Sequence, residues 1–363
     1  MSIFDNKFPQ DLSRIYDESL ANQLANTQGA IGSLNLLDRV LHNPTLLMHP
    51  LLGKEAESSS QLEGTQASIA DAYKIDIMEQ TPNKRNDAYE IRNYEDAMLN
   101  GLEIIKKMDL NNFVIRTVHK TLLRGVRGKN KHPGEFRKGD AWIGNKGTKK
   151  GESRYVAPDA IHVPKLMEDL TKFISHSGTV HPLIACGIIH HRFEAIHPFE
   201  DGNGRTGRLI MSLYLIKKGL LKLPILYPSG YFEKNRDDYM DLLSGIDKNE
   251  KWYEWLLFFL KGLEKQAKLS LNVGNDIDSF FKESRLKIEK EKASINLVKV
   301  LEYMFTKYYI TAPILHKETN IPISSCKRYL TTLAEKKIIY DLNIHKQQRV
   351  YANIRLLNLL KNI

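Results

Sequence analysis

Apolar residues recur at three- and four-residue spacing along most of the chain, which is the pattern of amphipathic α-helices. The clearest predicted helices cover residues 57–72, 87–108 and 113–123, and the helical pattern resumes over 163–263. A shorter apolar stripe over 34–41 ends at Asn43 and Pro44. This stripe would serve either the core or a contact between two copies of the chain, so a homodimer stays open. The pattern predicts a mainly α protein.

One stretch, between Pro133 and Pro158, departs from the helical pattern. Two short β-prone runs at 141–144 and 153–156 flank a polar turn that is rich in glycine and lysine. Runs of this kind around a glycine-containing turn are typical of a β-hairpin. We therefore expect a two-stranded flap over 141–156, although an ordinary surface hairpin would show the same pattern.

The last hundred residues divide into two parts. Residues 264–292 are polar and charged and predict a linking helix with little core of its own. Residues 293–363 then predict three short helices followed by two β-prone pieces, which is the outline of a winged helix-turn-helix. Ser324 and Ser325 would cap its recognition helix, which carries Lys327 and Arg328. Such modules bind DNA or mediate protein contacts and dimerisation, and the pattern leaves both open.

Composition narrows the class of protein. With 363 residues, 42% hydrophobic and 26% charged, the chain is long enough for two or three globular domains. Its two cysteines, Cys186 and Cys326, form no CxxC pair, which excludes a disulfide scaffold and a cysteine-based zinc site. The first twenty residues do not resemble a secretory signal, and no apolar run approaches 18 residues. We expect a cytoplasmic protein without membrane contact.

The net charge of +10 is concentrated in two regions. Residues 281–363 contain 16 Lys and Arg against 7 Asp and Glu, and residues 115–154 contain 12 against 3. The rest of the chain is mildly acidic. A basic region can attract nucleic acid, nucleotides or acidic partners, so the two regions are separate candidate surfaces.

The segment 197–208, HPFEDGNGRTGR, concentrates residues that bind anions. Gly202, Asn203 and Gly204 stand just before an apolar helical run, where small residues let backbone N–H groups face a bound anion. Arg205 and Arg208 would oppose the helix dipole there by about 0.3–1 kcal/mol each. That placement makes sense when a polyphosphate binds, because each guanidinium can hold its oxygens bidentately.

Two further residues of this segment supply chemistry. Asp201 is suited to a Mg²⁺ ion that bridges phosphates, since Mg²⁺ takes few protein carboxylates plus substrate oxygens. His197 can act as a general base near neutral pH. The set predicts phosphoryl or nucleotidyl transfer. The sequence contains no HExxH zinc signature and no GxxxxGK[ST] phosphate loop.

Residues 197–208 fill every fixed position of HPFx[DE]GNGRxxR, so the chain resembles the Fic-domain family. The resemblance covers roughly 30–263 and includes the family's flap and the segment near the adenine end, with Asn235. It implies a protein adenylyltransferase that moves AMP from ATP to a Tyr, Thr or Ser hydroxyl of a target protein. His197 would be the base, Asp201 the magnesium ligand, and 202–205 with Arg208 the site for the phosphates. Other transferred groups, or removal of AMP, remain alternatives.

The segment Ser59 to Gly64, SSQLEG, reads on its own as an ordinary helix turn. It also matches the family's inhibitory motif [ST]xxxE[GN], which implies that Glu63 pairs with Arg208 and weakens activity. On this resemblance the expected domains are 1–110 with an inhibitory helix over 57–72, a catalytic core over 111–263, a linker over 264–292 and the winged-helix-like unit over 293–363. The modified protein could be the chain itself. The competing hypothesis is a DNA-binding regulator whose core senses nucleotide.

Overall fold

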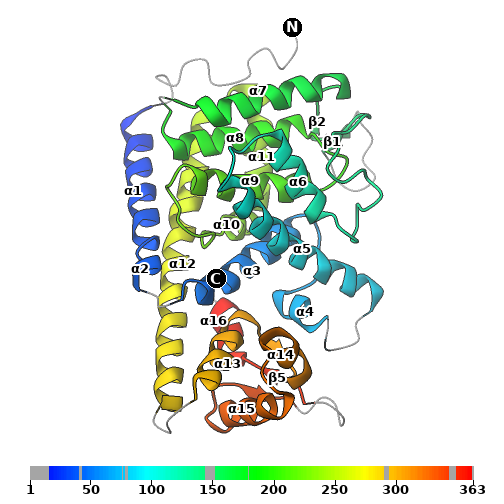
Figure 1. The fold of residues 1–363 in the computed structure, drawn as a ribbon. Helices are drawn as coiled ribbons and strands as arrows, with labels where there is room; N and C mark the ends of the chain where they lie inside the picture. The colour runs from blue at the N-terminus through cyan, green and yellow to red at the C-terminus, as the bar shows by residue number, and fades with distance from the viewer. Residues whose placement is uncertain are drawn as a thin grey trace.

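The computed structural model describes residues 16–40, 43–75, 77, 81–143, 152–178, 180–289, 294–342 and 349–361. The described part is mainly helical, as expected, with two small antiparallel sheets (Figure 1). The helices before the flap are α1 (Glu18–Leu34), α2 (Leu37–Val40), α3 (Thr45–Leu62), α4 (Ile69–Lys74), α5 (Pro82–Ile105) and α6 (Asn112–Leu122). After the flap come the 3-10 turn η3 (Ala160–His162), α7 (Val163–His176), α8 (Pro182–Ile196), α9 (Asn203–Lys217), α10 (Ser229–Lys234), α11 (Arg236–Asn249) and α12 (Trp252–Glu289).

Helices α8 and α9 form the centre of the N-terminal part of the molecule, which comprises α1 to α12. Every residue of α8 from Leu183 to Ile196 is buried, which explains why its sequence is apolar around almost the whole helix. Helix α9 packs against α8 and is in turn covered by α5 and α6, while α7 covers α8. The loop between two buried helices is consequently held on both sides, and this loop is the segment that the sequence singles out.

The flap is present where the sequence predicts it. Strand β1 (Trp142–Ile143) pairs with β2 (Tyr155–Val156) in antiparallel register, with Trp142 opposite Val156. The glycine- and lysine-rich turn at 144–151 lies outside the described residues. The Tyr155 hydroxyl donates to the carbonyl of Ala195 at 3.1 Å, which fastens the flap to the end of α8.

The prediction that 264–292 form a linking helix with little core of its own is wrong. Helix α12 runs without interruption through 252–289, and its second half buries residues such as Val273, Ile277 and Phe280. Helix α1 packs along it, and Gly274 meets Leu37 so closely that an added Cβ would come within 2.5 Å of a leucine methyl. The polar composition of 264–292 belongs to the solvent face of an amphipathic helix, whose apolar stripe supplies core.

The single helix predicted over 57–72 is not present. The structure has α3 over 45–62 and a separate short helix α4 over 69–74, in place of one helix over 57–72. Gly64 has φ of +90°, a conformation that suits glycine and ends α3. The serines at 58–60 therefore occupy the last turns of a helix, and Glu63 is its C-cap.

The C-terminal unit contains the predicted three helices and β-prone pieces. It comprises α13 (Ile295–Thr306), β3 (Tyr309–Ile310), α14 (Ala312–Thr319), α15 (Ile323–Glu335), β4 (Tyr340–Asp341), β5 (Tyr351–Ala352) and α16 (Ile354–Lys361). The sequence did not indicate β3 or α16. The N-cap of α15 is Pro322, so Ser324 and Ser325 lie within the helix and do not cap it.

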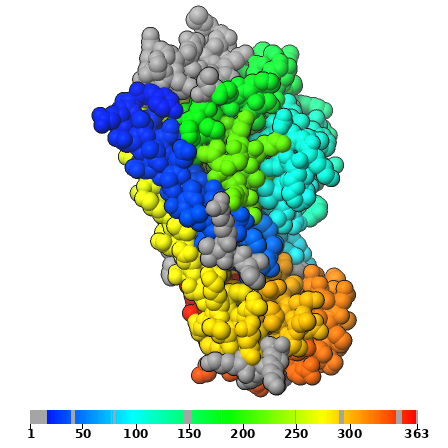
Figure 2. Space-filling view, turned by 60° about the vertical axis from the view of Figure 1, so that its left-hand side comes forward, coloured from blue at the N-terminus to red at the C-terminus, as the bar shows by residue number. Residues whose placement is uncertain are grey.

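This unit packs on the N-terminal part of the molecule. Helices α13 and α16 contact both α3 and α12. Tyr308 is fully buried and meets the Tyr73 ring edge-on at 4.6 Å between centroids, and the Lys307 ammonium lies 5.2 Å from the same ring. Figure 2 shows the unit as a lobe at one end of the molecule, with α12 running beside it. Within the described ranges, no helix combines the length and apolar character needed to cross a bilayer.

Candidate active site

The loop from His197 to Gly204 joins α8 to α9 and has a constrained backbone. His197 caps α8 in the left-handed conformation, with φ of +50°, and Gly202 caps α9 with φ of +77°. The Asn203 side chain accepts from the Phe199 N–H and donates to the Phe199 carbonyl, both at 2.8 Å. Asn203 thus acts as a clamp within the loop, a more specific role than the phosphate cradle expected from sequence.

Two side chains that the sequence did not single out hold this loop from outside. Arg137 is 3% exposed and donates through Nε to the His197 carbonyl at 2.8 Å, while its other nitrogens bond carbonyls beside the flap. His119 of α6 accepts from the Gly134 N–H at 2.8 Å through Nδ1. Its Nε2 therefore carries the proton and donates to the Asp201 carbonyl at 2.9 Å. The flap and the loop are in this way fixed to one another.

A cavity of about 190 Å³ opens between the loop, the flap and α11. His197, Gly204 and Arg208 line it together with Glu63, so four of the residues chosen from sequence meet in one place. Flap residues, Tyr239 of α11 and α8 residues such as Glu194 also line it. Asp201 and Arg205 are not among the residues that line this cavity.

The His197 ring is neutral in this environment. Burial lowers its pKa to about 4, against a partly opposing effect of the nearby Glu63 carboxylate. A neutral imidazole can accept a proton at pH 7. His197 therefore has the protonation state that a general base needs.

Glu63 forms an ion pair with the Arg208 guanidinium. Its Oε1 accepts from Arg208 Nη2 at 2.8 Å, and Ser59 accepts from Arg208 twice, through its hydroxyl at 2.8 Å and its carbonyl at 2.9 Å. Burial would raise the pKa of the Glu63 carboxyl, but the Arg208 and Arg205 charges outweigh it and hold the pKa below its ordinary value. A Cβ built on Gly204 would overlap Glu63 Oε1. The carboxylate thus lies against the glycine loop that was predicted to bind phosphate.

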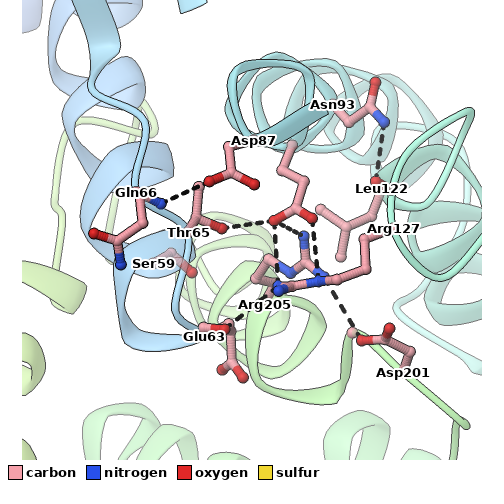
Figure 3. Close-up of polar contacts among 12 residues, drawn as sticks. Ser59, Glu63, Thr65, Gln66, Asp87, Asn93, Leu122, Arg127, Asp201 and Arg205 are labelled. Atoms are coloured by element: carbon pink, nitrogen blue, oxygen red, sulfur yellow. Dashed lines mark hydrogen bonds and ion pairs between the residues drawn. The ribbon is translucent and has the colours of Figure 1, made fainter. Parts of the chain in front are cut away.

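Arg205 faces a different carboxylate. Its Nη1 lies 3.0 Å from Glu90 of α5, and both side chains are almost completely buried. Thr65 donates to Glu90 at 2.6 Å, and Arg127 Nε lies 3.3 Å from it, so three elements converge at this point (Figure 3). Arg127 also donates to the Glu63 carbonyl at 3.3 Å. This network ties the segment after α3 to the start of α9, and no sequence signal distinguishes Glu90 from other glutamates of an amphipathic helix.

Asp201 suits a magnesium ion by the chemistry of its surroundings. Its side chain is 31% exposed, and one oxygen lies 3.8 Å from Arg205 Nη2. The other oxygen lies beside Gly128, where a Cβ would come to 2.9 Å, so glycine leaves it room. Among the described residues no three His, Cys, Asp or Glu side chains gather into a metal site. A single accessible carboxylate fits an ion that takes its other ligands from phosphates and water.

Asn235 is a predicted site residue that does not line the cavity. It lies between α10 and α11, and its side-chain amide donates to the Tyr231 carbonyl at 2.8 Å. The next residue, Arg236, lines the cavity. Contact between Asn235 and the nucleotide stays a prediction.

Two models of known families match the chain. The Fic/DOC family matches residues 109–215, and the Fic/DOC family N-terminal model matches residues 21–103. Together they cover just over half of the sequence, including α3, the loop and α9. The chain belongs to the Fic/DOC family.

This Fic/DOC chain is similar to a protein adenylyltransferase Fic from Drosophila yakuba, with 29% identity over 142 residues. The matched region is 39% of this chain and 25% of that protein. The protein of the same name from Drosophila virilis is 26% identical over 184 residues, 48% of this chain and 35% of the relative. The chain thus spans about a quarter to a third of these relatives. A crystal structure of a Fic family protein from Desulfovibrio desulfuricans G20 has the same fold, with a TM-score of 0.58, 21% identity, and coverage of 93% of this chain and 96% of that one.

Proposed function

We propose that this chain is a protein adenylyltransferase that moves AMP from ATP to a protein hydroxyl and is restrained by Glu63. The observation that carries the proposal is the meeting of His197, Gly204, Arg208 and Glu63 around one cavity beside the flap. The names of the relatives support it. The hydroxyl belongs to a Tyr, Thr or Ser of a target protein, or of the chain itself.

The transfer step follows from the position of the base. The hydroxyl oxygen of the target forms a bond to the α-phosphorus of ATP, the bond from that phosphorus to the β-phosphate oxygen breaks, and pyrophosphate leaves. His197, neutral at pH 7, takes the hydroxyl proton. Arg137 holds the His197 carbonyl and so keeps the ring at the cavity wall. The flap strand β2, bonded to Ala195, would hold the target segment near this base.

The phosphates would be bound by charge and by backbone. The N-terminus of α9 offers free N–H groups and partial positive charge to an anion. Arg208 would supply a guanidinium group for the β- and γ-phosphates. Arg205 would supply a second one if its guanidinium binds phosphate as well as Glu90. A Mg²⁺ ion at Asp201 would neutralise phosphate charge when bound. The clamp made by Asn203 keeps the loop shape that exposes these groups.

Glu63 would act as a brake by competing for the same cation. Its carboxylate already accepts from Arg208 and lies against Gly204, so a γ-phosphate meets both an occupied guanidinium and a negative charge. ATP bound under these conditions would be displaced from the geometry needed for in-line attack on its α-phosphorus. Glu63 lies at the C-terminal end of α3. Arg127 donates to the Glu63 carbonyl and Thr65 donates to Glu90, and these two bonds hold the segment around Glu63.

The test compares two preparations of ATP, one labelled at the α-phosphate and the other at the γ-phosphate. Glu63→Gly protein incubated with α-labelled ATP should become labelled, whereas γ-labelled ATP should leave no label, because pyrophosphate is released. His197→Ala in the same background should abolish labelling. Label from γ-labelled ATP would instead indicate a kinase-like transfer and would refute the proposal. Loss of preformed AMP from protein on restoring Glu63 would show that the same site also removes the group.

A further inference from the structure

No residue of the C-terminal unit, 294–361, is among those that line the cavity, which leaves the role of this unit open. Its elements follow the order α13, β3, α14, α15, β4, β5, α16, and its sheet has the strand order β3-β5-β4, all antiparallel. Helices α14 and α15 are joined by a three-residue turn in which Asn320 has φ of +56°. Two helices joined by so short a turn form a helix-turn-helix. With the β4–β5 hairpin after the second helix, the arrangement is that of a winged helix.

The turn between α14 and α15 is fixed by side chains. The His316 ring bonds the Ile321 carbonyl at 2.7 Å, and the Cys326 thiol donates to the same carbonyl at 3.3 Å. The Thr331 hydroxyl lies 3.4 Å from the Tyr351 hydroxyl, which connects α15 to strand β5. The orientation of α15 on the unit is therefore well defined. A fixed second helix is what reading a DNA groove requires.

The outer face of α15 is exposed and basic. Ser324, Lys327 and Arg328 are exposed on it, while Cys326, Leu330 and Leu333 point into the unit. Lys317 on α14 and Lys337 after α15 are exposed as well. The acidic side chains on these two helices are Glu318 and Glu335. Glu335 lies two turns beyond Lys327 and Arg328, at the C-terminal end of α15, so the N-terminal half that would enter a groove has no acid on it.

The unit packs on the N-terminal part of the molecule through elements other than α15. Helices α13 and α16 contact α3 and α12, and Tyr308 fills the junction against Tyr73. Helix α15 packs on α13 and α14, at the end of the molecule far from α7 (Figure 1). Because α13 and α16 make the contacts with α3 and α12, the basic face of α15 is left accessible to a large anionic partner.

We infer that this face binds double-stranded DNA, with the N-terminal half of α15 in the major groove. Lys and Arg at such positions contact guanine edges and phosphates, and Ser can contact any base. This inference is independent of the transferase proposal, since none of these residues lies near the cavity.

Binding can be measured by fluorescence anisotropy, with the full-length protein and short random-sequence duplexes over a series of salt concentrations. The double variant Lys327→Ala/Arg328→Ala should bind about tenfold or more weakly. It should also reduce the slope of log K against log salt by about 1.8, since each lost phosphate contact removes about 0.9. The matched control is Lys165→Ala/Lys172→Ala on α7, which removes the same charge from a distant exposed surface and should bind like wild type.

A second variant protects the test against misfolding. Ser324→Glu places a negative charge in the first turn of α15, where it favours the helix dipole but repels DNA. It should lower DNA affinity without lowering the melting temperature. Repeated selection from the random duplex pool should enrich a common sequence.

Three results would overturn the inference. They are absence of duplex binding at low salt, equal binding by wild type and Lys327→Ala/Arg328→Ala, and a selected pool without enrichment. The second result would point to the basic stretch 115–154 as the DNA contact, and the first would assign the α15 face to a protein partner.

Discussion

Replacement of Glu63 by glycine should increase the rate of AMP transfer. The change removes the carboxylate that accepts from Arg208 at 2.8 Å and that lies against Gly204. Ser59 still accepts from Arg208 through two oxygens, so the guanidinium keeps its position. The variant thus frees the cation for a γ-phosphate without removing the supports of the site.

The size of the effect follows from the charges. Two unit charges about 4 Å apart interact by about 4 kcal/mol at an effective dielectric constant of 20. The Arg208 side chain is 2% exposed but that of Glu63 is 36% exposed, so solvent screens part of this. We take about 2–3 kcal/mol as the penalty on productive ATP binding. At about 1.4 kcal/mol for each factor of ten, Glu63→Gly should be about 30- to 150-fold faster than wild type.

The assay is the initial rate of AMP incorporation into protein at matched enzyme and ATP concentrations. Glu63→Gln should lie between wild type and Glu63→Gly, because it loses the charge but keeps a hydrogen-bonding oxygen. Glu250→Gly is the matched control, since Glu250 also caps a helix C-terminus but is exposed and is not among the residues that line the cavity. Equal rates for wild type and Glu63→Gly would show that Glu63 is not a brake.

Three further predictions concern pH and packing. In the Glu63→Gly background, kcat/KM should stay level from pH 8 down to pH 6, because burial lowers the pKa of His197 to about 4; a midpoint near 6.5 in the pH–rate profile would contradict this. Burial raises the pKa of Glu194 to about 8, so its proton stabilises the folded state at low pH and this contribution is lost as pH rises through 8. Melting scans from pH 6 to 9 should show a smaller fall for Glu194→Gln than for wild type, and parallel curves would exclude this role. Tyr308→Ala should lower the free energy of unfolding by about 3–5 kcal/mol, measured by urea titration, because the ring is fully buried against Tyr73; a loss below about 1 kcal/mol would mean that the junction is loose.

The local features of the site were predictable because they depend on short stretches of sequence. The anion loop at 197–204, the helix that follows it and the flap all come from residues that are close neighbours in the chain. The pairing of Glu63 with Arg208 joins distant residues, and only resemblance to a family indicated it. The observed 2.8 Å contact matches that expectation.

What could not be predicted depends on tertiary packing. Glu90, Arg137 and His119 act through residues that lie 60 or more positions away in the chain, and nothing in their local sequence marks them. The helix error over 57–72 arose because serines before an acidic residue suggest an N-cap, whereas the positive φ of Gly64 ends α3 there. The polar stretch 264–292 was misread because its apolar positions are few, yet residues such as Val273, Ile277 and Phe280 are buried in a helix that packs on α1 and on the C-terminal unit.

The central claim is that His197 and the loop after it transfer AMP to protein. Intact mass spectrometry after incubation with ATP and Mg²⁺ tests it most directly, on Glu63→Gly beside Glu63→Gly/His197→Ala. We predict a mass increase of one or more AMP groups in the first protein, with release of pyrophosphate, and none in the second. An unchanged mass in both proteins and in an added mixture of candidate target proteins, or an equal increase in both variants, would contradict the account.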